Sequence, residues 1–148
     1  MKSIDVPPVW LAAFLALAWC QTVYLPGLTF GGAWADFLGG ICLGGGILLL
    51  ILSLREFTRH KTTVHPHKES SNLIQTGVYK RSRNPIYLGD VLILTGLILY
   101  WDAVLSLPLV PIFVWIMEKR FIIPEEDRLR KKFRVQFAAY MRKTRRWL

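Results

Sequence analysis

Two short polar clusters in this apolar chain have the residue types needed for chemistry. The first is Arg83-Asn84-Pro85-Ile86-Tyr87, and the second is the acidic pair Glu125-Glu126, which follows Arg120 in the sequence. Acidic residues suit the first turn of a helix, because the helix dipole favours anions there. A helix that only lies on anionic lipid does not require such a pair. The pair therefore indicates a further role, in which a carboxylate attracts a cation or accepts a proton.

Asp90 and the histidines are further ionisable residues whose roles have to be weighed. An ionisable side chain inside a membrane segment indicates a function by default. Asp90 lies one turn from the start of such a segment. Because buried charges are usually paired, we expect Asp90 to pair with Arg83 or Arg55, with a role in substrate binding as the alternative. The histidines, His60, His65 and His67, lack plausible further ligands, so we predict no metal site.

The composition indicates a membrane protein, in which apolar helices position the polar residues described above. The chain has 148 residues, 53% of them hydrophobic, and its mean hydropathy is +0.34. A soluble fold of this length would struggle to hide so much apolar surface. The length indicates a single domain, 1–148. Its two cysteines, Cys20 and Cys42, lie in apolar runs and provide neither a disulfide framework nor a zinc set.

Four apolar segments predict an all-α membrane fold with about four transmembrane helices. A bilayer core of about 30 Å needs roughly 20 apolar residues in a helix. The predicted spans are approximately 8–25, 36–54, 85–100 and 103–121. The last two form a helical hairpin around Trp101-Asp102. The glycines of the second span lack the spacing of a nucleotide loop, so we interpret them as small residues that let two helices pack closely.

The basic residues predict how the spans are oriented. The loops 26–36 and 101–102 contain no lysine or arginine, whereas the linker 55–84 and the tail from Lys119 contain every one except Lys2. Cytoplasmic loops carry the excess of basic residues in membrane proteins. We therefore place both termini and the linker on the cytoplasmic side of an integral membrane protein.

The tail predicts an amphipathic cytosolic helix over 124–142. Pro124 suits the first turn of a helix. Leu129, Phe133, Phe137 and Tyr140 then form one apolar stripe, with basic residues over much of the remaining surface. A non-catalytic membrane scaffold with a basic, lipid-binding tail is the competing interpretation of this helix. Nucleic-acid binding fits the basic composition but not its position beside membrane exits.

Two motifs follow one another through the second half of the chain. They are Gly77-x-Tyr79-x3-Arg83-Asn84-Pro85-x-Tyr87-x-Gly89, then Glu125-Glu126-x2-Leu129-x3-Phe133-x6-Tyr140 with Arg146-Trp147. Over 62–148 the chain resembles the isoprenylcysteine carboxyl methyltransferase family, whose superfamily includes the phospholipid N-methyltransferases. It departs from that family at Asn84, where many members have histidine, at Arg134, where glycine is usual, and at Phe137, where tyrosine is usual.

The resemblance implies a membrane-embedded methyltransferase that uses S-adenosylmethionine and has no Rossmann domain. By motif position, the cofactor contacts are expected from Ser71, Asn72, Leu73, Ile74, Tyr79, Asn84, Pro85, Ile86, Tyr87 and Glu125. In such a site a carboxylate attracts the cationic cofactor, and the faces of Tyr79 and Tyr87 stabilise it further.

The resemblance also implies a lipidic or prenylated methyl acceptor, most like the carboxylate of an isoprenylcysteine. A carboxylate is already ionised and needs an anchor, for which we predict Arg120, although a positive residue that ends a span is the alternative interpretation. If the acceptor is a phospholipid amine or a small amine, a base must take a proton, and Glu126 is the predicted base. The sequence assigns no oligomeric state.

Overall fold

The computed structural model describes residues 4–60 and 73–148, which fold almost entirely into helices. The longer helices are α1 (Pro7–Tyr24), α2 (Ala33–Arg59), α3 (Pro85–Tyr100), α4 (Leu109–Met117), α5 (Ile123–Phe133) and α6 (Val135–Lys143). Short 3-10 turns are η1 (Gly77–Lys80) and η2 (Val104–Ser106), and η3 (Glu118–Ile122) is a π-helix. Over these residues no β-strand forms, and the predicted all-α fold is confirmed.

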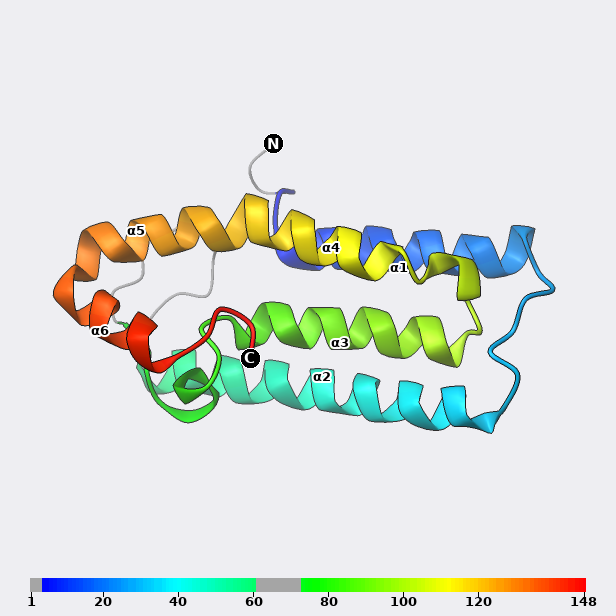
Figure 1. Ribbon diagram of the computed structural model, residues 1–148, viewed down its shortest axis with the longest axis horizontal. Coiled ribbons are helices and arrows are strands. Elements are labelled where there is room, and N and C mark those ends of the chain that lie inside the picture. Colours follow the sequence, from blue (N-terminus) through cyan, green and yellow to red (C-terminus); the bar gives the residue numbers. More distant parts are fainter. Residues whose placement is uncertain (1–3, 61–72) are drawn as a thin grey trace.

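Helix α3 is the centre of the fold. It lies between α2 on one side and α1 with α4 on the other (Figure 1). The link between α1 and α2 and the turn between α3 and α4 lie together at one end, where the Phe30 amide donates to Asp102 Oδ1 at 3.3 Å. At the other end lie η1, α5 and α6 (Figure 1). The end that holds η1, α5 and α6 is therefore the one that carries both polar motifs.

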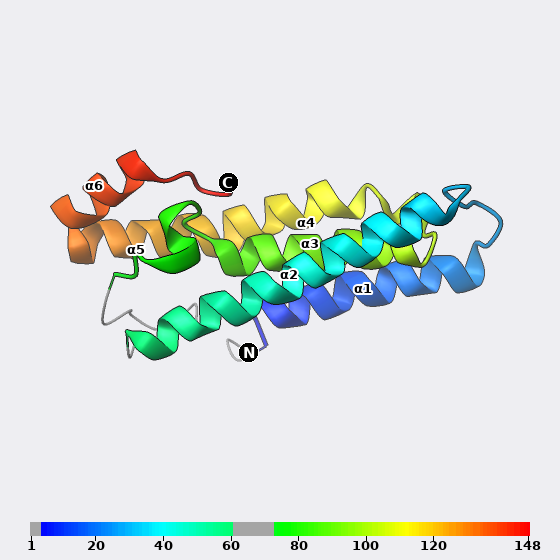
Figure 2. The same cartoon turned by 90° about the horizontal axis from the view of Figure 1, so that it is seen from below.

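Helices α2 and α3 cross (Figure 2), and glycines let their backbones approach closely. A Cβ on Gly39 would lie 2.7 Å from the carbonyl oxygen of Gly96, and one on Gly46 would lie 2.7 Å from that of Gly89. No side chain fits between the two backbones at these positions. The interpretation of the glycine-rich segment as a close helix contact is confirmed for Gly39 and Gly46.

The outer surfaces of α1 and α2 are apolar. Trp19, Phe37 and Ile51 are each more than half exposed. Both helices are long and apolar enough to cross a membrane, and α3 is a shorter apolar helix of 16 residues. These features agree with an all-α membrane protein, while four spans remain a prediction.

Helices α4, η3 and α5 run on as one continuous rod, which differs from the predicted boundary between residues 121 and 124. Pro124 does not interrupt it, although proline has no amide to donate within a helix. The register changes instead through the π-turn Glu118–Ile122. The rod carries α5 beyond the apolar bundle without a loop.

The tail is broken at Arg134, so the predicted helix 124–142 is two helices. Arg134 has φ 43° and ψ −109°, a backbone conformation that favours glycine. The predicted apolar stripe still converges across the break, because Phe137 and Tyr140 are buried against Leu129 and Phe133. Arginine at a position where glycine is usual therefore leaves the fold of the tail intact but strained.

Arg134→Gly is expected to raise the free energy of unfolding by about 1 kcal/mol, because glycine adopts this conformation without strain. The control is Arg142→Gly, an exposed position inside α6 where glycine should lower stability by about 1 kcal/mol. Denaturant unfolding of the protein in detergent measures both. An equal loss in the two variants would contradict the strain at Arg134.

Candidate active site

A cavity of about 620 Å³ lies beside the polar end of α3. This volume is typical of sites for small molecules and cofactors. The residues that α1, its preceding residue Val6 and α2 contribute are all apolar: Val6, Pro7, Pro8, Leu11, Ala12, Leu15, Leu50, Leu54 and Phe57. The polar lining comes from other segments: Tyr79, Arg83, Asn84, Tyr87, Asp90, Glu125 and Tyr140. The cavity thus joins an apolar wall built by two membrane helices to a polar wall built by the motifs.

Glu125 and Tyr87 form the central contact of the polar wall. The Tyr87 hydroxyl donates to Glu125 Oε2 at 3.2 Å, and the Tyr87 ring stacks on Phe121 with centroids 6.3 Å apart. Glu125 is partly buried, and desolvation raises the pKa of its carboxyl group. Its hydrogen bond to Tyr87 and the charge of Arg128 act in the opposite direction. A bound cation would favour the ionised carboxylate, so the site is suited to a positively charged ligand.

Tyr79 is the aromatic residue that η1 places in the cavity. Its ring is buried and lies edge-on to Phe57, with centroids 6.0 Å apart, and its carbonyl oxygen accepts a 2.7 Å hydrogen bond from the Tyr140 hydroxyl. Burial and the nearby charge of Glu125 raise the pKa of Tyr79 well above its usual value. Tyr79 is therefore a neutral phenol that can donate a hydrogen bond.

A buried contact with α2 holds η1 in place. Glu56 accepts a hydrogen bond from the Thr76 hydroxyl, which also lies 2.9 Å from His60 Nε2. Gly77 follows with φ +62°, and a Cβ there would lie 2.6 Å from Glu56 Oε1. Glycine adopts this backbone conformation without strain and leaves room for Glu56, so Gly77 sets the path of the chain into Tyr79.

Gly77→Ala is expected to destabilise the protein by about 1–3 kcal/mol and to weaken ligand binding in the cavity, because the new methyl displaces Glu56 and shifts Tyr79. Gly40→Ala is the control, since nothing lies within 4 Å of the added Cβ. Thermal unfolding and ligand titration of both variants check this. Equal stability and equal binding in the two variants would contradict the role given to Gly77.

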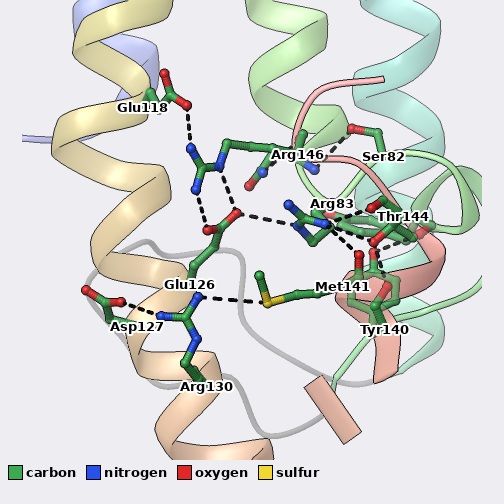
Figure 3. Close-up of polar contacts among 12 residues, drawn as sticks. Ser82, Arg83, Glu118, Glu126, Asp127, Arg130, Tyr140, Met141, Thr144 and Arg146 are labelled. Carbon is green, nitrogen blue, oxygen red and sulfur yellow. Dashed lines mark hydrogen bonds and ion pairs between the residues drawn. The ribbon is translucent and has the colours of Figure 1, made fainter. Parts of the chain in front are cut away.

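The C-terminal segment is fastened to the motif that begins α3. The Arg83 amide donates to the Arg145 carbonyl at 2.9 Å, and Asn84 Nδ2 donates to the Arg146 carbonyl at 3.0 Å. The Arg83 guanidinium donates to the Thr144 carbonyl at 2.9 Å (Figure 3). These contacts leave the Asn84 side-chain oxygen as the atom of that amide able to accept a hydrogen bond in the cavity.

Glu126 lies at the centre of an ion-pair network rather than in the cavity lining. It binds Arg146 through two hydrogen bonds of 3.1 and 2.9 Å, and Arg83 Nε lies 3.5 Å from its Oε1 (Figure 3). Arg146 also pairs with Glu118. Glu126 is only 4% exposed, so the network joins α5, the start of α3 and the C-terminal segment inside the protein.

The structure brings most of the predicted cofactor residues together. Ser71 and Asn72 lie outside the described residues, as do His65 and His67. The predicted residues that line the cavity are Leu73, Ile74, Tyr79, Asn84, Ile86, Tyr87 and Glu125. Pro85 is buried in the first turn of α3 between Asn84 and Ile86.

Arg120 is not among the lining residues of this cavity. Its Nε donates to Asp5 Oδ1 at 2.6 Å, and its guanidinium lies over the Trp10 ring at 5.5 Å. Trp10 Nε1 donates to the same carboxylate oxygen at 3.1 Å. Arg120 thus ties η3 to the start of α1 in a partly exposed contact.

The expected pairing of Asp90 with Arg83 or Arg55 is wrong for the described part of the chain. Asp90 lines the cavity and is 4% exposed, and no described residue forms a hydrogen bond or an ion pair with its carboxylate. Arg83 turns instead to Glu126 and to the C-terminal segment. Helical spacing is the signal for Asp90, since it follows Ile86 by four residues and therefore shares its face of α3.

The fold is that of an all-α membrane protein with a cavity at its polar end. A family model described as phospholipid methyltransferase matches residues 34–136. This match spans well over half of the chain, which belongs to the phospholipid methyltransferase family and is thus a membrane methyltransferase. No curated protein and no solved structure matches the chain significantly.

Proposed function

We propose that the protein transfers a methyl group from S-adenosylmethionine to the amine of a membrane lipid. One observation carries this proposal: a single cavity combines the predicted cofactor residues of four separate segments with an apolar wall from two membrane helices. The motifs supply the polar groups and the bilayer-facing helices supply the surface for an acyl chain. A scaffold with a lipid-binding tail requires no such cavity.

The polar wall matches the chemistry of S-adenosylmethionine. This molecule carries a sulfonium and an ammonium, both of which favour a carboxylate such as Glu125 in a site poor in water. The aromatic faces of Tyr79, Tyr87 and Tyr140 suit a cation or an adenine ring. The side-chain oxygen of Asn84 accepts a hydrogen bond, and Leu73, Ile74 and Leu129 provide apolar contacts.

The chain's own residues act by positioning and by electrostatics. S-adenosylmethionine, when bound, would supply a methyl group activated for attack by an acceptor lone pair, with the electron pair of the carbon–sulfur bond left on sulfur. Glu125, oriented by Tyr87, would attract the positive charge of the cofactor, and the apolar wall would exclude water. No covalent intermediate with the protein is needed.

The acceptor is proposed to enter sideways from the bilayer. Helices α1 and α2 both pack on α3 and make few contacts with each other, while Leu11 and Leu15 of α1 line the same cavity as Leu50 and Leu54 of α2. An acyl chain between these leucines would leave the lipid headgroup facing the polar wall. The basic residues around this end favour the cytoplasmic side of the membrane.

An amine is favoured over a carboxylate as the reacting group. Two carboxylates, Asp90 and Glu125, line the cavity. Arg83 is the only lysine or arginine in the described lining, and its guanidinium is already bonded to the Thr144 carbonyl and paired with Glu126. The two carboxylates of the cavity would therefore repel a carboxylate acceptor. Arg83, the basic residue of the described lining, already has other partners and would not be free to bind it.

Equilibrium binding tests the cofactor site. S-adenosylmethionine is titrated into the full-length protein in lipid nanodiscs and competed with S-adenosylhomocysteine. Saturable binding that the competitor removes supports the proposal. A folded sample that binds neither molecule would favour the scaffold interpretation.

A further inference from the structure

Asp90 is the buried charged group that the proposed cofactor site leaves without a role. It is 4% exposed, lines the cavity, and forms no hydrogen bond or ion pair with any described residue. Burying an unpaired carboxylate is unfavourable, so buried carboxylates normally have a partner. The missing partner of Asp90 is therefore expected to be a ligand that enters the cavity.

The surroundings of Asp90 define the chemistry of that ligand. The wall contributed by α1 and α2 is apolar, and among the described lining residues Arg83 alone is basic and is committed to the Glu126 network. A carboxylate beside such a wall favours a positively charged group attached to an apolar chain. A lipid ammonium has both features, whereas the polar cofactor has no apolar chain.

The two carboxylates of the cavity come from different helices, Glu125 from α5 and Asp90 from α3. Glu125 is bonded to Tyr87, while Asp90 lies three residues further into α3, which corresponds to about 4.5 Å along the helix axis. A ligand held at Glu125 and another held at Asp90 would therefore lie next to each other. Direct transfer requires that the donor and the acceptor share one site, and both carboxylates line the same cavity.

We propose that Asp90 binds the ammonium group of the lipid acceptor and takes one proton from it; this inference rests on the proposed function. The ammonium R–NH₃⁺ and the carboxylate become the amine R–NH₂ and the carboxylic acid, which frees the nitrogen lone pair for the new bond. After the methylated product leaves, the proton of Asp90 passes to water. One proton is thus released for each methyl group transferred.

A binding experiment tests the ammonium site without the cofactor. Octylammonium chloride and octanol are compared as ligands by the thermal shift they cause in the full-length protein in phosphatidylcholine nanodiscs. Asp90→Asn is expected to weaken binding of octylammonium at least about 10-fold and to leave octanol unchanged. The control is Asp36→Asn, which removes an exposed carboxylate near the start of α2. Equal octylammonium binding by the wild type and Asp90→Asn would overturn the proposal.

Stability and turnover separate this role from a structural one. Asp90→Asn should be at least as stable as the wild type, because it removes an unpaired buried charge, and it should bind S-adenosylhomocysteine normally. Its methyl transfer to phosphatidylethanolamine should fall by about 100-fold or more, with partial recovery in Asp90→Glu. A marked loss of stability or of S-adenosylhomocysteine binding would overturn the assignment. If the wild type binds octylammonium through Asp90 but not S-adenosylmethionine, the proposed function fails and the ammonium site stands.

Discussion

Glu125→Gln is expected to weaken binding of S-adenosylmethionine by about 100-fold, which corresponds to roughly 2.7 kcal/mol. The substitution keeps the size of the side chain and a hydrogen-bond acceptor for Tyr87 but removes the negative charge from the cavity. A cation in a site poor in water loses a strong attraction when that charge is removed. Titration calorimetry of the protein in nanodiscs measures the change.

Asp127→Asn is the matched control, because Asp127 is an exposed carboxylate of the same helix that pairs with Arg130. It should bind the cofactor like the wild type. If both variants bind normally, the donor site does not depend on Glu125. If both variants lose binding, the loss results from the changed overall charge of α5 and not from the removal of a carboxylate from the cavity.

The raised pKa of Glu125 gives the same site a pH dependence. Burial raises this pKa, so the carboxyl group loses its proton at a higher pH than an exposed glutamate does. The affinity for the cationic cofactor should therefore increase as the pH rises through that raised pKa. The increase should be absent in Glu125→Gln, and a parallel pH profile in that variant would assign it to another group.

Glu126→Ala is expected to lower the free energy of unfolding by about 3–5 kcal/mol, the largest stability loss in this account. It leaves Arg83 and Arg146 without the buried carboxylate that joins them. Glu118→Gln is the control, because Glu118 contacts Arg146 at a more exposed position and should lose far less. Denaturant unfolding in detergent provides the comparison.

Glu126→Gln separates this structural role from proton transfer. Glutamine keeps the shape and part of the hydrogen bonding of the network, so some folded protein should remain. We expect that folded fraction to bind S-adenosylmethionine and to transfer methyl groups at a rate close to that of the wild type. A well-folded variant without transfer would restore Glu126 as the base predicted from the sequence.

Much of the polar wall of the cavity could be predicted from the sequence, because its residues lie in short motifs. Asn84, Ile86 and Tyr87 are fixed by the start of one helix, and all line the cavity. Neighbouring helical residues, in contrast, point about 100° apart, so the pair Glu125-Glu126 cannot both face one site. Nothing in the order of the two residues tells which of them faces the cavity and which faces the arginines.

The remainder depends on contacts between distant parts of the chain. Arg120 finds Asp5 more than a hundred residues away, and the apolar wall of the cavity comes from helices without any motif. Asp90 was expected to take Arg83 as its partner, but the C-terminal segment and Glu126 occupy that arginine first. The rule that buried charges are paired does not say which residues form each pair. Here the tertiary structure determines the partner of each charge.

Transfer of a tritiated methyl group from S-adenosylmethionine into lipid tests the central claim most directly. The full-length protein is placed in phosphatidylcholine nanodiscs that also contain phosphatidylethanolamine, phosphatidylglycerol or a prenylcysteine. We predict label in the lipid fraction with phosphatidylethanolamine, and its loss in Glu125→Gln. Label confined to the prenylcysteine would contradict the amine acceptor, and no label from folded protein with phosphatidylethanolamine would contradict the account as a whole.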